Sequence, residues 1–290
     1  MRFYFEKGEV VMRNSVLQKA AEKIFDDFIT TTPFVNNFDD SFPLIRRRLS
    51  KKINSLSPRK MILQVTGDAK NRIFINVYEE AKTPELGKRV IRKTPALSLQ
   101  RLWKTYNSAI SKNVENGGLP KAGSRRGYDW YSYPNMQKIQ KEIFDLSNDH
   151  TDELGLISSL DKNVTRRAVA NFLLQFVTSG EEIKILLKAT NDTDHFVHNM
   201  AWKSLIAKLK GGKIPSLTVQ LLVKRSFSLL KHPSVICRNK ALVFIKEVIK
   251  KSRYRFPLPN NARLLVNEAA HSSNPIISGP ANKIIKALRR

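Results

Sequence analysis

Several features are scarce or missing in this chain of 290 residues, and each absence excludes a class of protein. Cys237 is the only cysteine, so the sequence allows neither an intramolecular disulfide nor a cysteine-based zinc site. No run of about 18 uncharged apolar residues occurs, and residues 1–15 have no apolar stretch of signal-peptide length, so no membrane span is predicted. The expected location is therefore intracellular: cytoplasmic, or nuclear if the source is eukaryotic.

Acidic residues are scarce relative to basic ones. The chain holds 51 Lys plus Arg against 25 Asp plus Glu, a formal net charge of +26 at pH 7. Because such an excess repels itself, it is typical of proteins with a polyanionic partner: nucleic acid, an anionic membrane or an acidic protein face. Hydrophobic residues make up 41% of the chain, which is enough for a packed core and argues against wholesale disorder.

The N-terminal part, residues 1–114, has the pattern of a small α+β domain. Its clearest signal is a β-hairpin over 61–78, in which two alternating, β-branched runs flank turn residues 67–71. Apolar spacing adds a short hairpin in the first 12 residues and helices at 15–30, 43–57 and 96–113. Residues 115–134 hold four glycines and two prolines without helical periodicity, and we interpret them as a basic, aromatic linker.

The linker is followed by 135–290, where no strand pattern remains and an internal repeat dominates. Four segments each open with a small polar residue and reach an alanine seven positions later: 161–168, 194–201, 234–241 and 274–281. The polar residue is predicted to cap a new helix, and the alanine allows two helices to approach closely. These residues are Asp161 with Ala168, Asp194 with Ala201, Ser234 with Ala241, and Asn274 with Ala281. A shorter helix precedes each segment, at about 152–160, 181–190, 215–231 and 261–271.

A polar residue, then a β-branched residue and an arginine, then an alanine is the pattern of the HEAT-repeat family, which residues ~150–290 resemble. The predicted fold class is mostly α: a C-terminal HEAT-like α-solenoid of about four helix pairs, preceded by a small α+β domain with a β-hairpin. Two departures are that only Arg238 fills the arginine position and that Gly279 and Pro280 lie in the last helical start. The resemblance implies a binding role without a particular ligand, and second helices that line a concave surface.

Positive charge is concentrated on the predicted second helices, which are expected at 163–177, 195–210, 235–251 and 276–290. These helices carry 14 Lys or Arg against one acid, Glu247, whereas the first helices carry six against five. Positions five and nine after the repeat alanine share one helix face, so their lysines would form a ladder along a solenoid. Such a ladder suits a nucleic-acid backbone, although surface lysines can also serve solubility alone.

We therefore predict a non-enzymatic protein that binds the phosphate backbone of DNA or RNA through a basic solenoid face. In the linker, Trp130 could stack on bases beside two arginines, or the aromatics there could instead fasten the linker onto the first repeat. The predicted nucleic-acid-binding residues are Arg125, Arg126, Trp130, Arg166, Arg167, Lys203, Lys210, Arg238, Lys246, Lys250, Lys283, Lys286 and Arg290. The main alternative is an interaction scaffold or adaptor that binds an acidic protein partner.

No catalytic constellation, cofactor or metal site is predicted. A D-x-D-H-x-x-H pattern begins at Asp192, but it falls at an inter-helix turn where Asp194 is expected to cap a helix. One enzymatic alternative remains, because some HEAT-like proteins are alkylpurine DNA glycosylases that use tryptophans and an aspartate at the lesion. Trp202 and Asp161 would have to fill these roles here.

Overall fold

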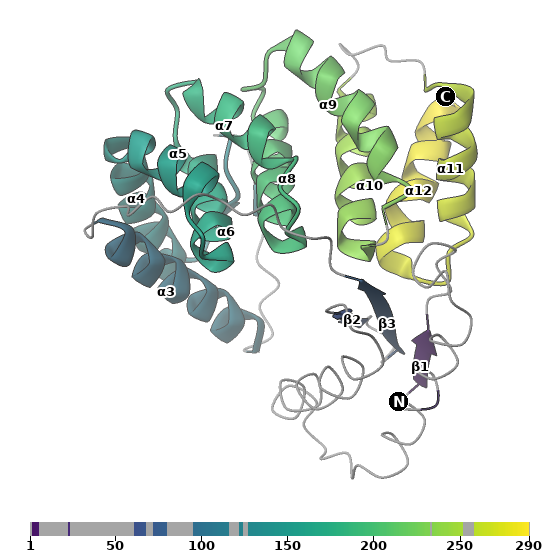
Figure 1. Ribbon diagram of the computed structural model, residues 1–290, viewed down its shortest axis with the longest axis horizontal. Helices are drawn as coiled ribbons and strands as arrows, with labels where there is room; N and C mark the ends of the chain where they lie inside the picture. The colour runs from purple at the N-terminus through teal and green to yellow at the C-terminus, as the bar shows by residue number, and fades with distance from the viewer. Residues whose placement is uncertain are drawn as a thin grey trace.

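The computed structural model describes residues 2–5, 23, 61–67, 72–79, 95–115, 122–123, 127–232, 234–251 and 258–289. The described chain is mostly helical, as Figure 1 shows. Its helices are α3 (Pro95–Glu115), α4 (Pro134–Asp149), α5 (Thr151–Leu160), α6 (Val164–Leu173), α7 (Glu181–Ala189), α8 (His195–Lys210), α9 (Ser216–Leu229), α10 (Val235–Lys250), α11 (Asn260–Ala270) and α12 (Pro275–Leu288), with a short 3-10 helix, η1 (Leu174–Phe176). The helices predicted after residue 135 are confirmed to within a few residues, and α4 is an additional one.

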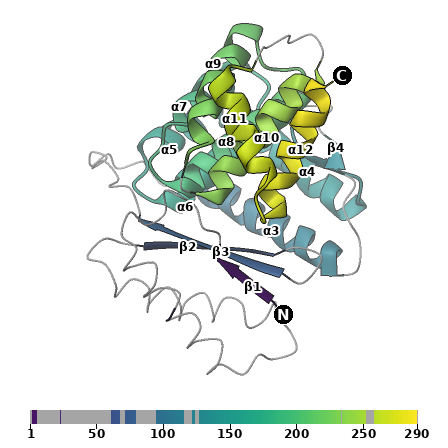
Figure 2. The ribbon, with the colours of Figure 1, turned by 90° about the vertical axis from the view of Figure 1, so that its right-hand side faces the viewer.

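Three strands, β1 (Arg2–Phe5), β2 (Met61–Gly67) and β3 (Arg72–Glu79), form a sheet in the order β1-β3-β2. Strands β2 and β3 are antiparallel, which confirms the hairpin predicted over 61–78 (Figure 2). Strand β1 pairs in parallel with β3, so the strand expected within the first 12 residues has a distant partner. The rest of that predicted hairpin, and the predicted helices at 15–30 and 43–57, lie outside the described residues except for the helical Lys23.

Helix α3 belongs to the helical core. It packs against α4 and α6, and its Leu99 and Tyr106 are buried in one apolar cluster with Phe172 and Phe176. The ring of Tyr106 lies 5.2 Å from that of Phe172. The domain division predicted at residue 114 therefore does not hold for α3, because its apolar stripe is buried only by packing against the helices that follow.

From α5 onward the described helices pack as pairs: α5 with α6, α7 with α8, α9 with α10, and α11 with α12. The second helix of each pair also packs against the second helix of the next, from α6 through α8 and α10 to α12. Figure 2 views this row from its α11–α12 end. The repeat alanines lie at these helix contacts and are each 0% exposed: Ala168, Ala201, Ala241 and Ala281. A larger side chain at any of them would force the helices apart.

The turn that starts each second helix is built the same way four times. The cap side chain accepts a hydrogen bond from a backbone N–H of the first helical turn, and the caps are Asn163, Asp194, Ser234 and Asn274. Two positions earlier, another side chain accepts from the N–H of the cap residue itself: Asp161, Asp192, His232 and Ser272. The successive turns thus share both hydrogen bonds, whatever the chemistry of the acceptor.

This geometry corrects the register of the first repeat. Asp161 was predicted to cap its second helix, but Asn163 does so, with its Oδ1 3.1 Å from the N of Arg166. Asp161 instead occupies the accepting position two residues earlier, which Asp192 occupies in the next repeat. Counted from the caps, the residue equivalent to the later alanines is Ala170, which is 1% exposed.

Helix α12 continues through Pro280, although proline cannot donate a helical hydrogen bond. The carbonyl left without that donor belongs to Ile276, four residues earlier. In the structure the Nδ2 of Asn239 on α10 donates to this carbonyl at 2.7 Å. The neighbouring repeat thus supplies the bond that the proline removes.

We expect Asn239→Ala to lower the free energy of unfolding by about 1–3 kcal/mol, because it leaves the partly buried carbonyl of Ile276 without a donor. Chemical denaturation of the full chain measures this loss. In a Pro280→Ala background, the backbone N–H of residue 280 can bond the carbonyl, so the same substitution should cost clearly less. An equal cost in both backgrounds would show that Asn239 does not compensate for the proline.

Candidate nucleic-acid interface

Four of the predicted interface cations are exposed to solvent: Lys210, Lys250, Lys283 and Lys286. The one acid of helices α6, α8, α10 and α12, Glu247, does not offset them at the surface. It is 8% exposed, and its Oε1 lies 2.9 Å from the Nζ of Lys246. The described surface of the second helices therefore presents cations without an accessible carboxylate on the same helices.

The remaining predicted residues lie in varied environments. Arg166, Lys203, Arg238 and Lys246 are partly exposed, and the Nε of Arg166 forms an ion pair at 3.1 Å with Asp161. Trp130 is 36% exposed. Three predicted residues lie outside those described: Arg125, Arg126 and Arg290.

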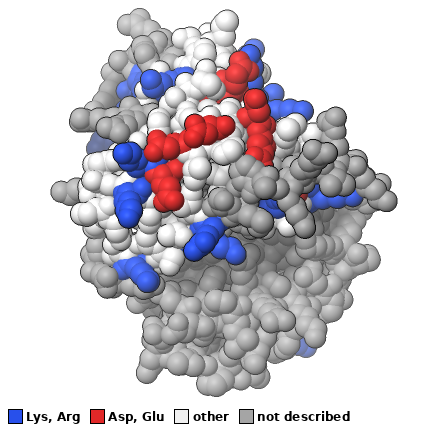
Figure 3. Space-filling model, turned by 90° about the vertical axis from the view of Figure 1, so that its left-hand side faces the viewer, with Lys and Arg blue, Asp and Glu red and all other residues white. Residues whose placement is uncertain are grey.

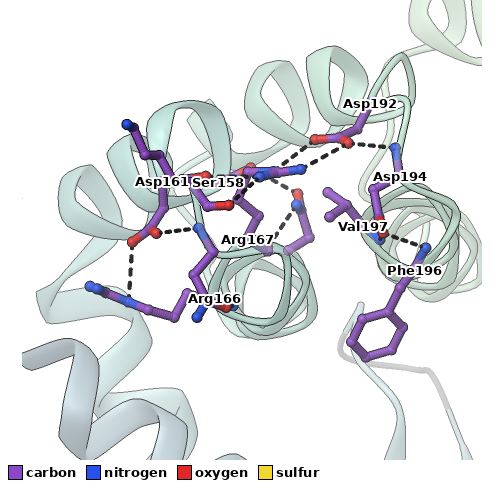
Figure 4. A network of polar contacts seen from close by, with 11 residues as sticks. Ser158, Asp161, Arg166, Arg167, Asp192, Asp194, Phe196 and Val197 are labelled. Atoms are coloured by element: carbon purple, nitrogen blue, oxygen red, sulfur yellow. Dashed lines mark hydrogen bonds and ion pairs between the residues drawn. The ribbon is translucent and has the colours of Figure 1, made fainter. Parts of the chain in front are cut away.

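Arg167 is buried, and Figure 4 shows its guanidinium pointing toward Asp192. It is 1% exposed, and its guanidinium contacts both carboxylate oxygens of Asp192, with Nε 3.0 Å from Oδ2 and Nη2 3.3 Å from Oδ1. Its Nη1 donates to the carbonyl of Asp161 at 2.8 Å. Arg167 therefore links its own inter-helix turn to the next one, and we leave it out of the interface.

The next repeat uses the same two positions with different chemistry. His198 lies four residues after its cap, as Arg167 does, and His232 is the equivalent of Asp192 in the following turn. Their rings stack with centroids 5.9 Å apart and an interplanar angle of 13°. Burial, reinforced by the charge of His232 and then of His195, lowers the pKa of His198 to about 4. Burial and the charges of His195 and Arg238 likewise lower the pKa of His232 to about 4.

His198 also fixes the surroundings of Trp202. The indole N–H of Trp202 donates to Nε2 of His198 at 3.1 Å, so a neutral His198 carries its proton on Nδ1, 3.2 Å from the Sγ of Cys237. Burial raises the pKa of Cys237 to about 11, which keeps this thiol protonated. Trp202 is 0% exposed and lies edge-on to Phe244, so it is a core residue that cannot reach a nucleobase.

The other side chains that a glycosylase or a metal site would need also make structural contacts within the fold. Asp161, the aspartate of the glycosylase alternative, pairs with Arg166 and accepts from the N–H of Asn163. In the D-x-D-H-x-x-H pattern, Asp192 holds Arg167 and Asp194 caps α8. No group of three or more metal-ligating side chains comes together within the described ranges.

The aromatic segment before α4 is fastened to the helices. Tyr128 is 5% exposed, and its ring lies 4.8 Å from that of Phe176. On either side of Asp129 the backbone is held by glutamine side chains: the N–H of Asp129 donates to Gln175 at 3.1 Å, and Gln140 donates to the carbonyl of Asp129 at 2.6 Å. Of the two roles considered for these aromatics, fastening the segment is the one that the described contacts show.

Asp129 is thereby held near two lysines of the second helices. Lys203 on α8 and Lys240 on α10 are both partly buried, and the Nζ of Lys203 lies 5.0 Å from the centroid of the Phe172 ring. Burial lowers the pKa of Lys203, and the nearby Asp129 opposes that shift. Burial, followed by the charge of Lys203, lowers the pKa of Lys240 to about 8, while Asp129 again opposes it.

Lys240 is not among the interface residues predicted from the sequence. It directly precedes the repeat alanine Ala241, whereas the predicted ladder of lysines uses positions that follow the alanine. The equivalent residues in the neighbouring repeats are Met200 and Pro280, so no periodic signal marks this position. Its setting depends on Lys203 and Asp129, which are far from it in the sequence.

Acidic side chains gather elsewhere. Figure 3 faces the α3–α4 end of the molecule and shows a stretch of acidic side chains there, with basic ones around it. Exposed acids on α4 and α5 recur at helical spacing: Glu142, Asp145, Asp149 and Asp152. The two signs of charge are therefore partly segregated: exposed acids gather on α4 and α5, and the second helices α8, α10 and α12 carry exposed lysines without exposed acids.

Comparison with protein-family models and with curated proteins finds no match for this chain, so the resemblance to HEAT repeats stays a prediction. Within the described part of the chain, no helix is both long enough and apolar enough to cross a bilayer.

The stacked histidines predict acid sensitivity. As pH falls below about 6.5, His198 and His232 become protonated in the unfolded chain. In the folded chain both stay neutral until the pH approaches their lowered pKa of about 4. The free energy of unfolding should therefore decrease from pH 6.5 to 4, with about 3 kcal/mol of the loss from His198. Denaturant unfolding at several pH values measures it.

His198→Gln removes the buried titrating group and should flatten this dependence. The control is His271→Gln, which changes an exposed histidine at the end of α11 and should leave the dependence as in the unmodified chain. The same pH profile in all three proteins would contradict the assignment of the acid sensitivity to the stacked pair.

Proposed function

We propose that the paired helices form a HEAT-type solenoid and that its second-helix surface binds the phosphate backbone of a nucleic acid. The repeated inter-helix turn supports the first part, because four turns share the same two side-chain hydrogen bonds. The packing supports it too. The second helices contact one another in unbroken succession, whereas among the described first helices only α5 and α7 pack extensively. A row that is tighter on one side curves toward it, which favours second helices on the concave face.

The observation that carries the binding proposal is the set of exposed lysines on α8, α10 and α12 without an exposed acid among them. Lys210 and Lys250 end their helices at equivalent positions. Their proximity is supported by Lys251, whose Nζ donates to the carbonyl of Lys210 at 3.0 Å across the two helix ends. Evenly repeated cations of this kind match the regular charge of a phosphate backbone and carry no base-specific groups.

The test is binding of labelled duplex and single-stranded oligonucleotides by the full chain, measured by fluorescence anisotropy at several salt concentrations. We expect clear binding at low salt that weakens steeply as salt rises. Reversal of three cations, Lys210→Glu, Lys250→Glu and Lys286→Glu, should abolish binding at moderate salt. Three lost phosphate contacts should lower the slope of log K against log salt by about 3. Because all three side chains are exposed, the thermal melt should change little.

A matched control separates a specific surface from bulk charge. Lys188→Glu, Lys224→Glu and Lys231→Glu change the net charge by the same amount, but these exposed residues lie on or just after the first helices α7 and α9. The control should retain most of the affinity. Equal loss in both triple variants would show that only net charge matters, and no binding at low salt would favour the scaffold alternative.

A further inference from the structure

The outward face of α3 carries cations and hydroxyl groups in a single stripe. The residues of its inner face pack into the helical core: Leu99, Leu102, Trp103, Tyr106 and Ile110. The stripe on the opposite face is exposed and recurs at helical spacing: Arg101, Lys104, Thr105, Ser108, Ser111 and Lys112. The sequence holds no acidic residue over 101–114, so α3 itself supplies no carboxylate within this stretch.

Part of this stripe forms the floor of an open pocket of about 470 Å³. Its described lining residues come from α3 and from the start of α4: Lys104, Thr105, Ser108, Ala109, Lys112 and Asn135. Lys104 and Lys112 are eight residues apart, which is about 12 Å along a helix axis. Because the side chains of Ser108 and Ala109 between them are small, the helix surface is hollowed there. The pocket therefore has a lysine at each end and a floor of small side chains.

Asn135 brings the start of α4 to this pocket. Pro134 at the first position of α4 has no N–H, and Tyr133 before it provides no side-chain cap. The Oδ1 of Asn135 accepts from the N–H of Met136 at 2.9 Å, so the amide NH₂ of Asn135 is the part of this side chain that can donate to a ligand. The positive end of the α4 dipole adds to the positive potential of the two lysines.

We propose that this hollow, which we call the α3–α4 pocket, binds a phosphate group through Lys104, Lys112 and Ser108. The proposal does not rest on the lysines of α8, α10 and α12, because α3 and α4 lie at the end of the row opposite α11 and α12 (Figure 1). A nucleic-acid strand and a free phosphate ester present the same group, and the experiment separates these two sources.

A phosphate matches these donors better than a carboxylate does. Its several oxygens accept from more than one donor at once, and the flexible stem of a lysine lets each amine reach over the floor from its own end. The Thr105 hydroxyl already donates to the carbonyl of Arg101 at 3.1 Å, so Ser108 is the hydroxyl that we expect to donate to the ligand. The volume also exceeds that of a bare phosphate and leaves room for an attached sugar or a neighbouring phosphate.

The test measures binding of a labelled single-stranded oligonucleotide by fluorescence anisotropy and of adenosine monophosphate by calorimetry, both with the full chain at low salt. The double variant Lys104→Gln and Lys112→Gln removes both ammonium groups and should weaken binding of at least one ligand by about tenfold. Ser108→Leu fills the floor without changing the charge and should weaken the same ligand several-fold. Because all three side chains are exposed, the thermal melts should change little.

A matched control separates the pocket from bulk charge. Lys138→Gln with Lys141→Gln removes the same charge from two exposed lysines of α4 that do not line the pocket. This control should retain most of the affinity for both ligands.

Weaker oligonucleotide binding by both pocket variants would assign the pocket to a nucleic-acid backbone, and an effect on adenosine monophosphate alone would assign it to a free phosphate ester. The proposal is overturned if neither ligand binds the unmodified chain, if the double variant binds both ligands as the unmodified chain does, or if Ser108→Leu has no effect. An equal loss in the control would also overturn it.

The same measurements keep this proposal apart from the proposed function. If the pocket variants leave oligonucleotide binding intact while reversal at Lys210, Lys250 and Lys286 abolishes it, the second-helix surface stands and the pocket does not bind the strand. If only the pocket variants weaken oligonucleotide binding, the site lies at α3 and the second-helix surface is refuted.

Discussion

The structure of the helical part depends on how the first N–H groups of each second helix are satisfied. A helix start buried between neighbouring helices must find acceptors for these groups. Here a cap side chain and a second acceptor two residues earlier do so at every described second helix. Because one residue of slip rotates an α-helix by about 100°, this turn also decides which side chains face inward. The alanines are thereby placed in the helix contacts, and the terminal lysines of α8 and α10 in solvent.

The same turn provides the connection between successive repeats. The acceptor two residues before the cap faces the side chain four residues after the preceding cap, and two chemistries occupy this pair of positions. Arg167 and Asp192 form a buried, doubly bonded ion pair, which needs both partners to avoid an uncompensated charge. His198 and His232 form a neutral stack that is stable only while both remain unprotonated. These two connections between repeats therefore use equivalent positions with different chemistry.

The cations of the second helices differ in how deeply they are buried, and the depth of burial limits what each can bind. Arg167 and Lys208 are interior and neutralised by carboxylates, so they contribute to the fold. Lys210, Lys250, Lys283 and Lys286 are exposed and can meet a partner at little cost. Lys203 and Lys240 lie between these extremes: they are shielded enough to be perturbed and open enough to be reached. A charge total does not separate these three kinds of cation, although they differ in what they can bind.

The helices after residue 135, the β2–β3 hairpin and the alanines of the last three repeats could be predicted from the sequence, because apolar periodicity and cap residues act over a few neighbouring positions. The first cap could not be, since Asp161 and Asn163 are both suitable and only the backbone turn selects between them. The sequence also could not distinguish Arg167 from Arg166, or reveal Lys240. Those outcomes depend on carboxylates and rings contributed by distant segments, and only tertiary packing brings these within reach.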